Sequence, residues 1–262
     1  MYCLSVCADT VFLALPFLER AKRISACGFL VEFWNWAGRD IDALARDPGI
    51  RISAFTGYTK GSMLHPDGIA NFIAGVRASL EVAKQLRCRS LFLSPGELDS
   101  NGQVSHKIAS HPATRWISAY KTLCQIAELA EREDVVYNLE HLNTKVDHPG
   151  FAFSRVEDAM NLLEEVGSSR IKLLLDVYHA QIEEGNVVSI IRQCRDHIGH
   201  VHIADVPGRH EPGTGEINYG NIYRKLAQLN YRHVAAMEFK PTGDPVEALR
   251  AAKAMVIKTT GA

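Results

Sequence analysis

The sequence predicts an α/β protein in which eight strand-and-helix units close into a parallel (β/α)8 barrel. Three observations support this fold class. Eight short apolar runs recur along the 262 residues, they alternate with segments of helical periodicity, and no linker or low-complexity stretch interrupts them. Parallel strands that are buried on both faces read as continuous apolar runs. Eight such units in a chain of this length favour one closed barrel, a single domain over residues 1–262, rather than an open sheet.

The strands are predicted in order from these apolar runs, each short enough to be a strand rather than a helix. The first four are expected at 3–8, 28–33, 51–56 and 90–94, and the last four at 135–140, 171–177, 199–204 and 233–239.

The helices between the strands are predicted from their periodicity and from the residues at their ends. The longest are expected at 66–87 and 114–133. A shorter helix is expected at 154–166, where Ser154 and Glu157 have the spacing of a capping box. The last helix opens with the run DPVE, which places proline at the first helical position. Alternation of strand and helix along the whole chain is typical of a parallel α/β fold.

Composition argues against several classes of protein. The 29 Lys plus Arg and 30 Asp plus Glu leave a formal net charge of −1, which gives no general reason to bind nucleic acid or an anionic membrane. No apolar run has the length of a transmembrane helix, and Asp9 interrupts the N-terminal apolar stretch, which argues against a signal peptide. Six scattered cysteines without a C-x-x-C pair are typical of a reducing compartment, so we expect a cytoplasmic protein.

Four predicted strands in the second half of the chain end in a side chain that can bind a metal. These residues are Glu140, Asp176, His202 and Glu238, separated by 36, 26 and 36 positions. The carboxyl ends of barrel strands meet at one rim, so we expect the four side chains to converge there. Any one of them could instead be a helix cap or part of a loop salt bridge. Their recurrence at matching positions favours a divalent cation, which removes the cost of gathering like charges. Mixed oxygen and nitrogen ligands suit Mn, Mg, Co or Zn.

Three further side chains are candidate substrate contacts at this rim. His179 lies three residues past Asp176, and we expect it in a loop over the rim. Arg209 lies in the segment DVPGRHEPGTGEIN, residues 205–218, which is predicted to be neither helix nor strand. Its guanidinium could bind a carboxylate through two parallel hydrogen bonds, or it could only hold the loop in place. Lys240 is predicted to share a strand face with Glu238, because residues i and i+2 lie on one side of a strand.

Three other residues near the predicted rim have a structural and a functional interpretation. Trp34 and Trp36 are expected to share one face at the end of the second strand. They could form an aromatic wall beside a substrate, or they could only pack the rim. His200 lies one layer deeper than His202, where a hydrogen-bonded interior residue is expected rather than a ligand.

The second half of the chain resembles the hydroxypyruvate isomerase family, within the wider sugar isomerase and epimerase group of TIM barrels. The resemblance lies in the segments EHLNTKVDHPG, DVYHAQIEEG, IGHVHIADVPGRHEPGTGEINY and AAMEFKP. It implies that the four strand-end residues bind the metal and that Glu140 and Glu238 are also the acid/base pair. It further implies that His179 and Arg209 contact the substrate. The first half of the chain matches more loosely.

This resemblance implies an isomerase that interconverts hydroxypyruvate and tartronate semialdehyde, or a closely related small 2-oxo acid or sugar. One glutamate would remove a proton beside a carbonyl to give an enediolate, and the other would return a proton to the adjacent carbon. A divalent metal would polarise the carbonyl. No organic cofactor is expected, because the reaction needs no hydride donor and the chain lacks the glycine-rich phosphate-binding motifs. We expect a small-molecule substrate, no nucleic-acid or membrane partner, and a homodimer by analogy with related barrels.

Three alternative functions remain open at this point. A ketose 3-epimerase would use the same metal site, and His202 favours it, since some hydroxypyruvate isomerases carry Gln there. An AP endonuclease-like nuclease would have a similar barrel. That family surrounds its metals with extra histidines after strands three and four, where this chain reads FTGYTKG and LSPGE. A non-catalytic binding module would not need two opposed glutamates at a metal.

Overall fold

The computed structural model describes residues 2–99, 101–105 and 110–261, and within them eight parallel strands form a closed barrel in chain order. The last strand pairs with the first, so no sheet edge is left open. The strands are β1 (Cys3–Cys7), β2 (Leu30–Phe33), β3 (Ile52–Thr56), β4 (Ser90–Leu93), β5 (Val136–Glu140), β6 (Ile171–Asp176), β7 (Ile198–Ile203) and β8 (Val234–Met237).

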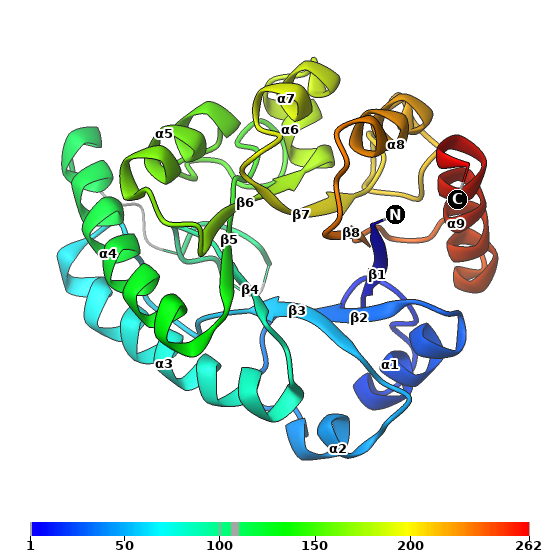
Figure 1. Cartoon of the computed structure of the whole chain (residues 1–262), viewed down its shortest axis with the longest axis horizontal. Coiled ribbons are helices and arrows are strands. Elements are labelled where there is room, and N and C mark those ends of the chain that lie inside the picture. Colours follow the sequence, from blue (N-terminus) through cyan, green and yellow to red (C-terminus); the bar gives the residue numbers. More distant parts are fainter. Residues whose placement is uncertain (1, 100, 106–109, 262) are drawn as a thin grey trace.

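Helices surround the barrel on its outer face, as Figure 1 shows. They are α1 (Phe17–Ala26), α2 (Ile41–Arg46), α3 (Pro66–Leu86), α4 (Pro112–Glu133), α5 (Val156–Val166), α6 (Val177–Glu183), α7 (Val187–Gln193), α8 (Tyr219–Gln228) and α9 (Pro245–Thr260). The predicted (β/α)8 barrel is therefore confirmed. None of the helices in the described part of the chain combines the length and the apolar character needed to cross a bilayer.

The predicted N-terminus of one helix is confirmed, and that of another is wrong. The prediction for α9 is confirmed, because the helix begins at Pro245. The side chain of Asp244 caps it by accepting hydrogen bonds from the backbone N–H groups of Val246 (2.8 Å) and Glu247 (3.0 Å). The capping box of α5 does not form. The backbone N–H of Val156 is instead bound by the carboxylate of Glu184, at 2.7 Å, and Ser154 lies outside the helix. A side chain from another element therefore takes the place of the local cap.

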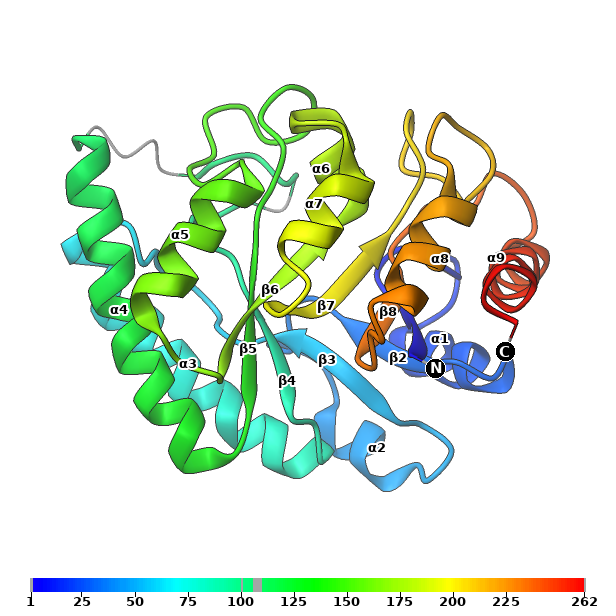
Figure 2. The same ribbon diagram turned by 45° about the horizontal axis from the view of Figure 1, so that its top comes forward.

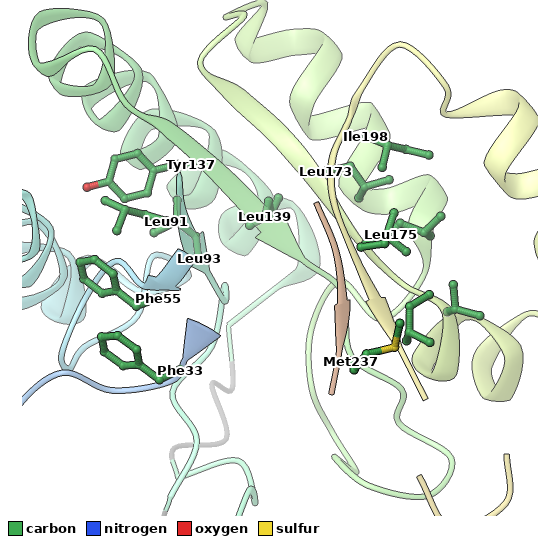
Figure 3. Packing of buried hydrophobic residues seen from close by; sticks show 14 of the residues in the cluster. Phe33, Phe55, Leu91, Leu93, Tyr137, Leu139, Leu173, Leu175, Ile198 and Met237 are labelled. Carbon is green, nitrogen blue, oxygen red and sulfur yellow. The ribbon is translucent and has the colours of Figure 1, made fainter. Parts of the chain in front are cut away.

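The main core lies between the barrel and its helices. Figure 3 shows side chains of neighbouring strands packed there, among them Phe33 and Phe55, whose rings stack with centroids 5.3 Å apart. A smaller cluster of Ala54, Phe92 and Leu174 forms separately. In a barrel of this kind alternate residues of each strand fill the interior in layers, so the barrel is packed and not a pore.

The segments that follow β5 and β7 rise at the same end of the barrel, as Figure 2 shows. This end carries the carboxyl termini of the strands. Side chains at the strand ends can therefore meet there beneath the connecting segments.

Candidate metal centre

The four strand-end residues come together at this rim. Each offers one ligand atom, and these atoms all lie within 4.8 Å of one another. Glu140 and Asp176 are the last residues of β5 and β6, His202 lies near the end of β7, and Glu238 directly follows β8. All except the half-buried Glu140 are buried. The convergence expected from the sequence is therefore present in the fold.

His202 stands at the centre of this group. Its Nδ1 atom lies 3.0 Å from Oε1 of Glu140, 3.2 Å from Oε2 of Glu238 and 3.7 Å from Oδ2 of Asp176. One imidazole nitrogen thus faces three carboxylates. Three carboxylate oxygens and one imidazole nitrogen form a mixed donor set that fits Mn, Mg, Co or Zn.

Asp176 serves two purposes at once. Its Oδ1 accepts a hydrogen bond of 3.0 Å from the backbone N–H of His179, so it caps the N-terminus of α6. Its other oxygen, Oδ2, belongs to the group around His202. The helix-cap interpretation of a strand-end carboxylate is therefore correct here, and it leaves one oxygen free for a cation.

The pKa values of these side chains are set by two opposing effects, burial and nearby charges. Burial raises the pKa of Glu140 to about 7, although the hydrogen bond and charge of His202 act in the opposite direction. Burial would also raise the pKa of Glu238, but the charges of His202 and Arg209 outweigh it and hold this pKa well below the usual range. For His202, burial is outweighed by Glu238 and Glu32, which raise its pKa well above the usual value. The carboxylates thus depend on nearby positive charge.

Arg209 reaches into this group from the segment after β7. Its Nη2 atom contacts Oε2 of Glu238 and lies 3.6 Å from Oδ2 of Asp176, and its side chain is only 16% exposed. Residues 205–218 form turns and a single bridge between Asp205 and His210, as the glycine and proline content predicts. The guanidinium therefore does more than hold its own loop.

His179 is not in a loop, contrary to the expectation from the sequence. It is the third residue of α6, because the cap formed by Asp176 starts the helix directly after the strand. The ring is fully buried, and its Nδ1 lies 2.7 Å from Nδ2 of Asn143, while its Nε2 lies 3.6 Å from Oδ2 of Asp176. Burial lowers the pKa of His179 to about 3, so the ring is neutral near pH 7.

Lys240 does not share the face of Glu238, and that expectation is wrong. The strand ends at Met237, so alternation no longer applies, and Lys240 is exposed whereas Glu238 is buried. The backbone of Lys240 instead supports the segment after β7. Its N–H donates to the carbonyl oxygen of Arg209 at 2.7 Å.

Two residues of the first half also reach this region. The indole Nε1 of Trp34 donates a hydrogen bond of 2.6 Å to Oε1 of Glu238, whereas Trp36 donates to Ser79 and packs on the main core. Glu32 lies on β2 and contacts His202 from the side opposite the other carboxylates. Sequence reasoning missed Glu32. An acidic residue inside the apolar run GFLVEF was the signal that could have identified it.

Comparison with known proteins gives consistent findings. A family model described as a xylose isomerase-like TIM barrel matches residues 20–259. The 2-oxo-tetronate isomerase of Cupriavidus necator is 36% identical over 236 residues, which cover 86% of this chain and 87% of the relative. The hydroxypyruvate isomerase of Escherichia coli is 29% identical over 245 residues, 89% and 92% of the two chains.

The structural comparison agrees on the fold. A crystal structure described as an AP endonuclease of family 2 from Brucella melitensis has a TM-score of 0.87 and 25% sequence identity. The match covers 97% of this chain and 99% of the other.

Proposed function

The chain belongs to the xylose isomerase-like TIM-barrel family, and we propose that it interconverts hydroxypyruvate and tartronate semialdehyde or a closely related small 2-oxo acid. It is an enzyme of the isomerase class, as its relatives are. The observation that carries the proposal is the convergence of two glutamates on one site. Glu140 and Glu238 come from non-adjacent strands and approach the same nitrogen of His202, at 3.0 and 3.2 Å.

Two carboxylates in one site suit a proton transfer between adjacent carbons. In the proposed reaction one glutamate removes a proton from the hydroxyl-bearing carbon, and the electron pair of that C–H bond moves into an enediolate. The hydroxyl proton passes to the oxygen of the former carbonyl, and the other glutamate delivers a proton to the former carbonyl carbon. Positioned proton transfer of this kind contributes about 10²–10⁴-fold in rate. A divalent cation held by Glu140, Asp176, His202 and Glu238 would polarise the carbonyl and stabilise the negative charge that develops.

The position of Arg209 favours a substrate with a carboxylate over a neutral ketose. Its guanidinium is mostly buried beside Glu238 and Asp176, so a positive charge is already in the site. A substrate carboxylate could accept two parallel hydrogen bonds from it. We propose His179 as a further substrate contact, because its neutral ring borders Asp176. Lys240 stays a predicted substrate contact, and its side chain is exposed.

Two other activities have less support. A ketose 3-epimerase with the same site stays a second candidate, because this chain carries His202 where some hydroxypyruvate isomerases carry Gln. A nuclease is disfavoured by the net charge of −1, since binding to a phosphate backbone depends on clustered cations.

An assay of the purified chain with Mn²⁺ or Mg²⁺ tests the proposal. We expect turnover of hydroxypyruvate or a four-carbon 2-oxo acid, with deuterium from D₂O appearing in the recovered substrate. Faster conversion of ketoses than of 2-oxo acids would favour the epimerase. Absence of both turnover and solvent exchange on every substrate, from a folded and metal-loaded protein, would overturn the proposal.

A further inference from the structure

A second charged group lies directly beneath the proposed metal site, inside the barrel. Glu32 on β2 is 1% exposed, and its Oε2 lies 2.9 Å from Nε2 of His200 on β7. Its Oε1 lies 3.1 Å from Nε2 of His202. The carboxylate therefore spans the barrel interior to reach both histidines. The proposed proton transfer makes no use of it.

Local irregularities on both strands accompany this arrangement. The register between β2 and β3 shifts at Val31/Glu32, and the register between β6 and β7 shifts beside Gly199, so that Leu174 pairs with His200. A Cβ atom at Gly199 would lie 2.2 Å from the side-chain oxygen of Asn138, so only glycine fits. Bulges of this kind re-aim side chains, often next to active sites. Here they accompany two inward-facing histidines and the carboxylate that joins them.

The two nitrogens of His202 have different surroundings. Nδ1 faces Glu140, Asp176 and Glu238, whereas Nε2 faces Glu32. The ring of Phe92 packs edge-on against His202, with centroids 5.2 Å apart and an interplanar angle of 85°, which restricts rotation of the imidazole. A metal-binding histidine commonly donates its second ring N–H to a carboxylate, which fixes the tautomer and the ring orientation.

We propose that Glu32 is a positioning residue for the metal centre. Its Oε1 accepts the Nε2 proton of His202, so that the lone pair of Nδ1 points into the site, and His200 holds the other oxygen of the carboxylate. In the structure, Oε1 of Glu32 and Nε2 of His202 are 3.1 Å apart but not aligned for a hydrogen bond, so the proposed contact requires a small rotation of the Glu32 carboxylate. This inference rests on the metal site of the proposed function.

The test is Mn²⁺ binding measured by calorimetry in the absence of substrate, which needs no turnover. We expect Glu32→Gln to weaken Mn²⁺ about 10- to 100-fold, because the neutral amide no longer selects the Nε2–H tautomer. In a His202→Gln background the same change should alter affinity less than about twofold, since Gln has no tautomer to fix. The control Ser5→Ala removes another interior hydrogen bond, to Ser53, and should leave Mn²⁺ binding unchanged.

The outcomes separate this inference from the proposed function. If the wild-type chain binds none of Mn²⁺, Mg²⁺, Co²⁺ and Zn²⁺, the proposed function fails with it. If the wild type binds and Glu32→Gln binds within about twofold, only the positioning role is overturned. A second bound cation that is lost in Glu32→Gln would also overturn it, because Glu32, His200 and His202 would then be ligands themselves.

A measurement on the unmodified protein covers the case in which Glu32→Gln does not fold. In the Zn²⁺-loaded wild-type chain, a long-range ¹H–¹⁵N spectrum reports which ring nitrogen of His202 carries the proton. We expect a protonated Nε2 and a metal-bound Nδ1. A proton on Nδ1 would overturn the proposal.

Discussion

The residues of the site are held by contacts that each engage more than one partner. Asp176 caps a helix with one oxygen and faces His202 with the other. Glu238 accepts a hydrogen bond from Trp34 and contacts both Arg209 and His202. Side chains with several fixed partners lose little freedom when a substrate binds. This preorganisation is what positioned proton transfer requires.

The first prediction concerns the two residues of the proposed acid/base pair. Glu140→Gln and Glu238→Gln keep the shape of each side chain but remove its ability to accept a proton. We expect each to lower kcat about 10²–10⁴-fold while the thermal unfolding curve stays cooperative. The matched control is Glu165→Gln, an exposed glutamate on α5, which should keep wild-type kcat. More than a few per cent of activity in both site variants would contradict the assignment.

Among the larger units of the fold, the segment after β7 brings Arg209 into the site. It has no helix or strand of its own, yet the buried carboxylate of Asp205 organises it. This carboxylate accepts backbone hydrogen bonds of 2.9–3.0 Å from Val206, Gly213, Gly215 and Ile217. A Cβ atom at Gly215 would lie 2.0 Å from the carbonyl oxygen of Val206, so the turn requires glycine. The segment thus presents Arg209 from a rigid base.

This element carries the prediction on substrate class. Arg209→Ala should raise KM for a 2-oxo acid about 10- to 100-fold, because a hydrogen bond between charged groups contributes about 1.5–3 kcal/mol. KM for a neutral ketose should change much less. Steady-state kinetics on both substrates measure the difference. Arg209→Lys keeps the positive charge but loses the paired N–H donors of the guanidinium, so its KM for the 2-oxo acid should lie between those of the wild type and Arg209→Ala. Equal effects on both substrates would favour the epimerase.

Across the whole molecule, barrel closure brings together residues that are far apart in the chain. Trp34 and Glu238 are 204 positions apart, and Glu32 and His200 are 168 apart. These contacts exist because β1 pairs with β8, which brings β2 close to the strands of the second half. The site therefore depends on the complete ring of strands.

The whole-molecule prediction concerns metal removal. A ligand that binds only the folded chain stabilises it by about 2.7 kcal/mol at one hundred times its Kd. For a chain of this size that corresponds to about 5–10 °C in Tm. Exhaustive chelation should therefore abolish activity and lower Tm, and Mn²⁺ should restore both, as calorimetry and activity assays can follow. Full activity in protein whose metal content is verified as nil would remove the metal from the mechanism.

Much of the fold could be predicted because local rules act at short range. The strand runs, the alternation with helices and the cap of α9 follow from buried surface and from hydrogen bonds a few residues apart. The failures occurred where a distant residue intervened, where a helix began directly after a strand, or where a strand ended early. Glu184 replaced the expected cap of α5, Asp176 started α6 before His179, and β8 stopped before Lys240.

The sequence by itself determined the barrel and the rim on which Glu140, Asp176, His202 and Glu238 meet. Strand periodicity places each strand end, and the parallel topology places all the ends on one side. Only the tertiary structure decided which partners surround these residues, including Trp34 on Glu238 and Glu32 beneath His202. The physical reason is that such contacts depend on the register of the closed barrel and on its bulges, which no local pattern in the chain encodes.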